Sequence, residues 1–104
     1  MNPRRKRVPP GQRKAEILSA AINLASRIGY QNITRETVAA EAHTSCALVT
    51  WYFTNMDILK SVIMRTAISE EILPIIAQGL SVGDEKVASI SLALKKKAIA
   101  FLKG

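Results

Sequence analysis

Residues 34–53 read TRETVAAEAHTSCALVTWYF, and this stretch decides the fold. Thr34 and Ser45 are good N-cap residues, because a short side-chain oxygen can accept a hydrogen bond from a free N–H in the first turn of a helix. A short helix-compatible segment follows each cap, and the turn His43-Thr44 separates the two segments. The stretch therefore predicts two short helices, the second over about 46–53, joined by a tight turn.

The second of these helices has two unlike sides. At about 100° per residue, Val49 and Phe53 point the same way, which predicts that they anchor the helix in the core. No residue between 46 and 53 is charged. An exposed apolar and aromatic surface is unfavourable in water, so it indicates a contact face. That face and its flanks carry Ala47, Leu48, Thr50, Trp51 and Tyr52.

Further helices are expected on both sides of this pair. An apolar stripe from Ile17 to Ile28 predicts a helix over about 12–28, with Gly29 just past it in the position of a left-handed cap. Asn55 is the expected N-cap of a long fourth helix. That helix should break near Pro74, because proline lacks an N–H and disfavours helical geometry in the residue before it.

The C-terminal part is expected to end in one more helix. Gly79 and Gly83 should bracket a loop, and Asp84 should cap a helix that runs to about residue 103. The predicted fold class is therefore all-α: a three-helix core, a long fourth helix broken near Pro74, and a C-terminal fifth helix. The predicted domains are an arm over 1–11, a helical domain over 12–60 and C-terminal helices over 61–104.

The charge of the chain is concentrated at its ends. The 104 residues include 15 Lys and Arg against 8 Asp and Glu, a formal net charge of +7. Residues 1–14 hold six bases and residues 93–104 hold four lysines, with no acid in either segment. Prolines and a glycine are expected to keep residues 1–11 from forming a helix, which predicts a basic arm of the kind that engages polyanions. The arm's bases are Arg4, Arg5, Lys6 and Arg7.

Two alternative roles stay open for the arm. It could be a leader that only aids solubility, or it could be a nuclear import signal. The run Lys95-Lys96-Lys97 is most simply a solvated face, with a second phosphate track or an anionic membrane surface as alternatives.

Several classes of protein are excluded by what the sequence lacks. One cysteine cannot close an internal disulfide, and no apolar run approaches the roughly 18–20 residues that span a membrane. No glycine-rich phosphate loop, nucleophile triad or cluster of metal ligands is present, so neither an enzyme nor a cofactor or metal site is expected. His43 stands apart from other metal-ligating residues. Cys46 stands at a helix N-terminus, where a thiol could act as a redox sensor. We favour the simpler interpretation that it is a small side chain close to a binding partner.

The stretch 17–59 resembles the N-terminal DNA-binding domain of the TetR/AcrR family of bacterial transcriptional regulators, and it aligns without a gap. The resemblance implies a three-helix core whose second and third helices form a helix-turn-helix, with the third helix in the major groove of DNA. The matching residues are Ile17, Leu18, Ala20, Ala21, Leu24, Gly29, Tyr30, Thr34, Val38, Ala39, Ala42, Ser45, Tyr52, Phe53 and Leu59.

The resemblance also implies roles for individual residues. Thr34 would hold a backbone phosphate, with Arg35 or Glu36 beside it reaching a phosphate or a base edge. Tyr52 matches a tyrosine that meets a phosphate. Because the third helix has no Arg, Lys, Asn or Gln, it is expected to read thymine methyls and DNA shape rather than to pair with guanine or adenine. The expected DNA-binding set is Arg4, Arg5, Lys6, Arg7, Thr34, Arg35, Ser45, Cys46, Ala47, Leu48, Thr50, Trp51 and Tyr52.

Three departures from the family pattern carry further expectations. His43 stands where the turn usually has glycine, and Met56 stands where a lysine usually contacts a phosphate. The third departure is that the 104 residues are expected to lack the ligand-binding domain of most members, which predicts little room for a drug-sized pocket and no small-molecule inducer. Dimerisation is then expected to come from Ile68–Leu80 and the last helix.

The expected function is a cytoplasmic, nucleoid-associated repressor that binds a palindromic double-stranded DNA operator as a homodimer, away from membranes. Its dimer interface would use the stripe Val87, Ile90, Leu94 and Phe101, unless that stripe packs onto the domain's own core. The alternative function is a protein–protein adaptor or inhibitor that docks a partner on Trp51 and Tyr52 and does not bind DNA.

Overall fold

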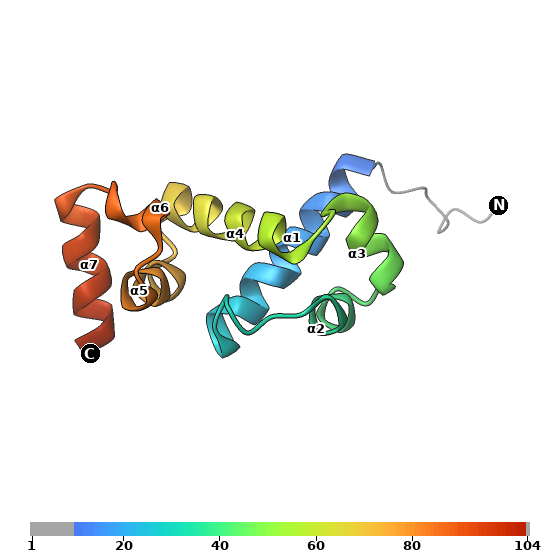
Figure 1. Cartoon of the computed structure of the whole chain (residues 1–104), viewed down its shortest axis with the longest axis horizontal. Coiled ribbons are helices and arrows are strands. Elements are labelled where there is room, and N and C mark those ends of the chain that lie inside the picture. Colours follow the sequence, from blue (N-terminus) through green and yellow to red (C-terminus); the bar gives the residue numbers. More distant parts are fainter. Residues whose placement is uncertain (1–9, 104) are drawn as a thin grey trace.

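The computed structural model describes residues 10–103, which form helices and no strand. Figure 1 shows the first three helices at one end, the last three at the other, and α4 running between the two groups. The described part is 53 Å long and 23 Å across in both other directions. Its helices are α1 (Pro10–Ile28), α2 (Arg35–Glu41), α3 (Cys46–Tyr52), α4 (Met56–Glu70), α5 (Leu73–Val82), α6 (Glu85–Ala88) and α7 (Leu92–Lys103).

Helix starts follow the local signals in the sequence. Thr34 caps α2, Ser45 caps α3, Asn55 caps α4 and Asp84 caps α6, each through a side-chain oxygen that accepts from a backbone N–H in the first turn. Gly29 ends α1 with a φ of 96°, the left-handed conformation that glycine adopts without a steric penalty. The first four predicted helices are confirmed to within a few residues of their expected starts. α1 begins at Pro10, however, so Pro10 and Gly11 belong to this helix and not to the arm that was expected over 1–11.

One hydrophobic core runs through both groups of helices. α4 and α5 carry its middle, since their inward side chains are fully covered on every side. This shared core means that the two ends are joined by packing as well as by the chain. The buried residues are Ile17, Ala21, Leu24, Ala25, Tyr30, Ile33, Val38, Ala39, Val49, Phe53, Leu59, Ile63, Met64, Ala67, Ile75, Ile76, Ala77, Val87, Leu94 and Ala98.

The break in the long fourth helix comes before the proline rather than at it. α4 ends at Glu70, Glu71 is left-handed with a φ of 54°, and α5 begins at Leu73. Pro74 therefore stands in the first turn of a new helix, where its missing N–H costs nothing. The expected break is confirmed near Pro74, but the proline opens α5 rather than kinking α4.

Two expectations for the C-terminal part are wrong. Gly79 does not open a loop, because it lies buried within α5, while Gly83 is the left-handed cap at the end of that helix. The single last helix is two helices, α6 and α7, which are separated by Ser89, Ile90 and Ser91. The Ser91 hydroxyl oxygen accepts the N–H of Leu94 at 3.2 Å and so marks the start of α7.

Candidate nucleic-acid interface

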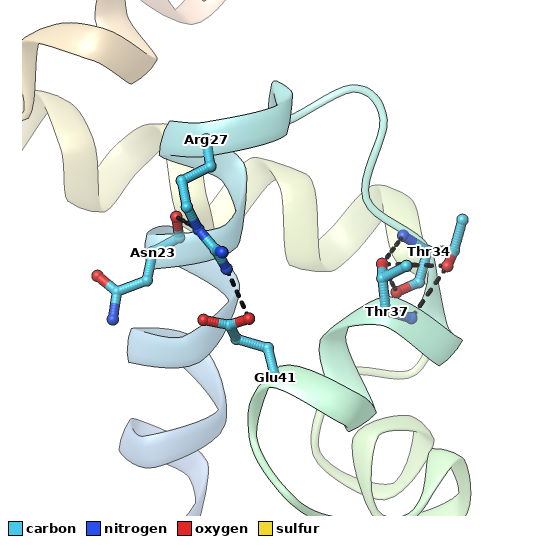
Figure 2. A network of polar contacts seen from close by, with 5 residues as sticks. All are labelled: Asn23, Arg27, Thr34, Thr37 and Glu41. Carbon is cyan, nitrogen blue, oxygen red and sulfur yellow. Dashed lines mark hydrogen bonds and ion pairs between the residues drawn. The ribbon is translucent and has the colours of Figure 1, made fainter.

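An ion pair joins α1 to α2 at the outer edge of the three-helix group. The Arg27 guanidinium donates to Glu41 Oε1 at 2.6 Å, and its Nε donates to the Asn23 carbonyl oxygen at 3.5 Å. Figure 2 shows Arg27 reaching down from α1 to Glu41 on α2. Both side chains are partly exposed, so the pair adds little to stability, but it helps to hold α2 at one angle to α1.

Thr34 and Thr37 form a closed set of hydrogen bonds at the start of α2. The N–H of Thr37 donates to Thr34 Oγ1 at 3.1 Å, and the N–H of Thr34 donates to Thr37 Oγ1 at 2.8 Å. Thr37 Oγ1 also donates to the Thr34 carbonyl oxygen at 3.0 Å (Figure 2). Because the Thr37 hydroxyl hydrogen is used there, the hydrogen of the exposed Thr34 hydroxyl can point to Thr37 or outward to a phosphate.

The turn between α2 and α3 is tight and includes a strained residue. His43 has a φ of 56°, a region that favours glycine, as the departure from the family pattern suggested. The N–H of Thr44 donates back to the Ala39 carbonyl oxygen at 2.9 Å and that of His43 to Ala40 at 3.2 Å. These bonds bring Ser45, the cap of α3, directly after the turn.

α3 has the predicted inner and outer sides. Val49 and Phe53 are 1% and 3% exposed, and they fix the helix in the core. Trp51 is 78% exposed, the largest value among the exposed large hydrophobic residues of the described chain. Ala47 and Thr50 are exposed beside it. The outer side is therefore an uncharged surface of small, hydroxyl and indole groups.

The other expected DNA-binding residues differ in how far their side chains are exposed to solvent. Cys46, Leu48 and Tyr52 are half-buried and pack against the core, so each presents only part of its side chain. Arg35 is half-buried too, and its Nε is covered without a hydrogen-bond partner among the described residues. Ser45 is exposed, although its oxygen already accepts the N–H of Leu48 at 3.1 Å. The arm residues Arg4, Arg5, Lys6 and Arg7 lie outside the described residues.

Thr50 has an unexpected hydrogen-bond state. Its hydroxyl donates to the Cys46 carbonyl oxygen at 3.1 Å, one turn back along α3. The hydroxyl hydrogen is thereby used within the helix, whereas the oxygen of this exposed residue keeps free lone pairs. In this state Thr50 can accept a hydrogen bond from a base amino group but cannot donate one to a base oxygen or ring nitrogen.

Some residues that shape this interface are not predicted by any sequence motif. The Lys14 ammonium stands 5.5 Å from the centre of the Phe53 ring, which places a positive charge beside the end of α3. The turn after α1 is held by three side chains from distant helices, Lys60, Gln78 and Asp84. Such contacts join residues that are far apart in the sequence, so no local pattern reveals them. The sequence could have placed Lys14 on α1, but it could not have shown that Lys14 lies beside Phe53.

The expected dimer stripe is largely covered by the chain itself. Val87 and Leu94 are 1% and 8% exposed and belong to the core, while Ile90 is half-buried against it. Phe101 is about half exposed. The large apolar side chains that are free on α7 are Leu92, Ile99, Phe101 and Leu102.

The expectation of little room for a pocket is wrong. A mostly apolar groove of about 410 Å³ lies between the end of α1 and helices α5 and α7, lined by Tyr30, Gln78, Phe101 and Leu102 among others. Its volume falls within the range of about 300–1,000 Å³ that is common for small-molecule sites.

Residues 10–103 hold neither a metal-binding cluster nor a membrane-spanning helix. No group of three or more His, Cys, Asp and Glu side chains there is arranged to hold a metal ion. Within the same residues, no helix combines the length and the apolar character that crossing a bilayer needs.

A short helix, a tight turn and a second short helix with an exposed outer side define a helix-turn-helix DNA-binding domain. Residues 17–59 match the model of the family described as bacterial regulatory proteins, tetR family. This segment is a TetR-family helix-turn-helix domain, and it makes the protein a DNA-binding transcription regulator. Neither the comparison with curated proteins nor the comparison with solved structures found a match.

Proposed function

We propose that the protein is a repressor that binds a palindromic double-stranded DNA operator as a homodimer, with α3 in the major groove. The observation that carries this proposal is the division of α3, whose Val49 side is buried while its Trp51 side is open to solvent. A helix anchored on one side alone can enter a groove about 12 Å wide with its outer side against the base edges. A cytoplasmic, nucleoid-associated location follows from the DNA partner.

Specificity and affinity come from different parts of the chain in this proposal. The outer side of α3 has no charged group, so it reads methyl groups, amino groups and groove shape. Affinity comes from the arm bases, from Lys14 beside α3, and from Thr34 at the start of α2. Each phosphate neutralised by a lysine or arginine makes the salt dependence steeper, by a slope of about −0.9 in a plot of log affinity against log salt.

The dimer in this proposal has its two copies side by side. Half-sites one helical turn apart lie about 34–36 Å from each other. That spacing exceeds the 23 Å width of the described chain, so two copies with parallel long axes would not touch along their length and would have to lean together at the α7 end. The free apolar residues Leu92, Ile99, Phe101 and Leu102 support a contact through α7, since Val87 and Leu94 are covered.

The experiment is a selection of bound duplexes from a random pool, followed by gel shifts over a salt series. The proposal expects an inverted repeat whose half-sites are about one turn apart, and a steep salt slope. Sedimentation at micromolar concentration, with and without the selected duplex, should give a dimer on the DNA. A monomer under both conditions, or a pool with no enriched sequence, would contradict the proposal.

A protein–protein adaptor is the second candidate, and the 78% exposure of Trp51 favours it, because a bare indole suits a protein partner as well as DNA. The same gel shift separates the two functions. An adaptor of this kind leaves DNA unshifted at low salt, where even non-specific electrostatic binding is strong.

A further inference from the structure

Tyr30 is held from two sides by the C-terminal helices. It follows the left-handed Gly29 at the end of α1, and its side chain is 1% exposed. The backbone N–H of Tyr30 donates to Gln78 Oε1 at 2.7 Å, and its hydroxyl donates to Asp84 Oδ2 at 2.6 Å. Gln78 lies on α5 and Asp84 is the cap of α6, so the partners of Tyr30 come from about fifty residues further along the chain.

Both partners are themselves held in place. Gln78 Nε2 donates to the Ala25 carbonyl oxygen at 3.0 Å, so one amide group joins the last turn of α1 to the residue after it. Asp84 Oδ1 accepts the N–H of Lys86 at 2.9 Å while Oδ2 accepts from Tyr30. Each carboxylate oxygen of Asp84 thus has one donor, which fixes the direction of the side chain. We call the contacts of Tyr30 with Gln78 and Asp84 the Tyr30 latch.

A short turn connects the Tyr30 latch to α2 and, through α2, to α3. Tyr30 stands four residues before Thr34, the cap of α2, and the turn between them is closed by the N–H of Asn32 on the Gly29 carbonyl oxygen at 3.0 Å. From α4, Lys60 Nζ donates to the Gln31 carbonyl oxygen at 3.2 Å. Only three residues separate Tyr30 from the cap of α2, and α2 packs against α3.

We propose that Gln78 and Asp84 are positioning residues for DNA binding. Through Tyr30 they hold the turn that sets the angle of α2 and α3, so that the C-terminal helices tune affinity for DNA without touching it. The inference rests on the proposed function. It assigns these residues no contact with DNA, since they lie on the C-terminal helices at the other end of α4 from α3 (Figure 1).

The test compares three folded variants of the full chain on the duplex recovered from the random pool. Tyr30→Phe keeps the ring packing and removes the hydroxyl bond, and we expect it to weaken binding about three- to tenfold. Gln78→Leu keeps the size of the side chain but removes the acceptor of the Tyr30 N–H and the donor to the Ala25 carbonyl oxygen. We therefore expect Gln78→Leu to weaken binding by a similar factor.

The matched control is Ser91→Ala. It removes the hydroxyl that accepts the Leu94 N–H, so it lowers stability at a site in the C-terminal helices that does not contact the turn. At a temperature where circular dichroism shows every variant folded, Ser91→Ala should bind DNA like the wild-type chain. Equal losses in Ser91→Ala and Tyr30→Phe would mean that stability alone controls binding, and would overturn the inference.

Failure of the inference and failure of the proposed function look different. A wild-type chain that binds its duplex, together with a folded Tyr30→Phe that binds equally well, overturns the positioning role alone. A wild-type chain that binds no duplex overturns the proposed function and this inference together. The slope of the salt dependence should be unchanged in Tyr30→Phe, because the latch holds no phosphate.

Discussion

Val49 and Trp51 stand two residues apart on α3 and face opposite ways, with 1% of the Val49 side chain exposed and 78% of Trp51. Two apolar residues of one seven-residue helix therefore contribute to different properties of the protein, one to stability and the other to binding. Val49 holds the helix in the core, and Trp51 offers an indole to a partner. The proposed function predicts that substitutions at these positions affect stability and binding separately.

Trp51→Ala should leave the free energy of unfolding within about 0.5 kcal/mol of the wild-type value, because the side chain is mostly in water. It should weaken binding to the selected duplex by about tenfold or more. Val49→Ala should instead cost about 2 kcal/mol of stability, as expected for removing buried methyl groups. Urea denaturation and gel shifts on the same samples measure the two effects, and a Trp51→Ala variant with unchanged DNA affinity would remove Trp51 from the interface.

Thr50→Val should change which bases the protein prefers. The valine keeps the shape and a methyl group but removes the oxygen that can accept from a base amino group. Because the Thr50 hydroxyl donates within α3, its free lone pairs favour adenine or cytosine at one position of the half-site. Selection from the random pool should lose that preference in Thr50→Val and keep the others. An unchanged selected sequence would show that Thr50 does not face a base edge.

Gly79→Ala should destabilise the protein despite the better helix propensity of alanine. A Cβ at this position would lie 2.7 Å from Met64 Cε and 3.0 Å from Val87 Cγ1, both of them core side chains. Overpacking costs about 1–3 kcal/mol, whereas the propensity gain is about 1 kcal/mol. The net loss should be about 1 kcal/mol by thermal or urea unfolding.

Met64→Leu is the background that checks this explanation. Leucine lacks the terminal methyl group that stands nearest to the added Cβ, so Gly79→Ala should cost less in that background than in the wild-type chain. If the cost of Gly79→Ala were the same in both, a clash with Met64 would not be its cause.

Stability should fall in alkaline solution through Tyr30. Burial, with the neighbouring Asp84 carboxylate, raises the pKa of Tyr30 from 10.0 to about 12. The folded state therefore favours the neutral phenol, and this contribution is complete below pH 10 and lost as the pH rises from 10 to about 12. Denaturation at a series of pH values should show a steeper alkaline loss in the wild-type chain than in Tyr30→Phe, and parallel curves would contradict the assignment.

In acid the same latch acts through Asp84. Burial opposes its charge, but the hydrogen bond from Tyr30, the backbone N–H of Lys86 and the Lys86 charge outweigh that effect, so the pKa of Asp84 is lowered from 3.8. The carboxylate thus stabilises the folded state above pH 3.8, and this contribution is lost as the pH falls below that value. Asp84→Asn should remove this acid dependence, whereas Ser91→Ala should retain it.

The N-terminal half could be predicted well because its signals are local. A cap such as Thr34 or Ser45 bonds to a backbone N–H two or three residues on, so the sequence contains both partners. The same holds for Gly29, whose left-handed conformation follows from the end of an apolar stripe. The sides of α3 follow from the angle between successive residues, which depends on helix geometry alone.

The C-terminal half was predicted less well because the conformation and burial of its residues depend on contacts with residues far away in the sequence. Gly79 looks like a loop residue in the sequence, but the structure uses its missing side chain to bring α5 close to Met64. Val87 and Leu94 have the spacing of an interface stripe, which is also the spacing of a core stripe. Which of the two they form depends on where α5 lies, and no local pattern contains that information.

The sequence by itself determined the helix-turn-helix, because caps, turn and helix sides all depend on hydrogen bonds and angles within a few residues. Only the tertiary structure decided how that motif is joined to the rest of the chain. Tyr30, Gln78 and Asp84 are ordinary residues in the sequence, and they become one hydrogen-bonded group when the core brings α5 and α6 against the end of α1. Contacts of that range follow from the packing of whole helices, whose relative positions are set by the sum of many buried side chains.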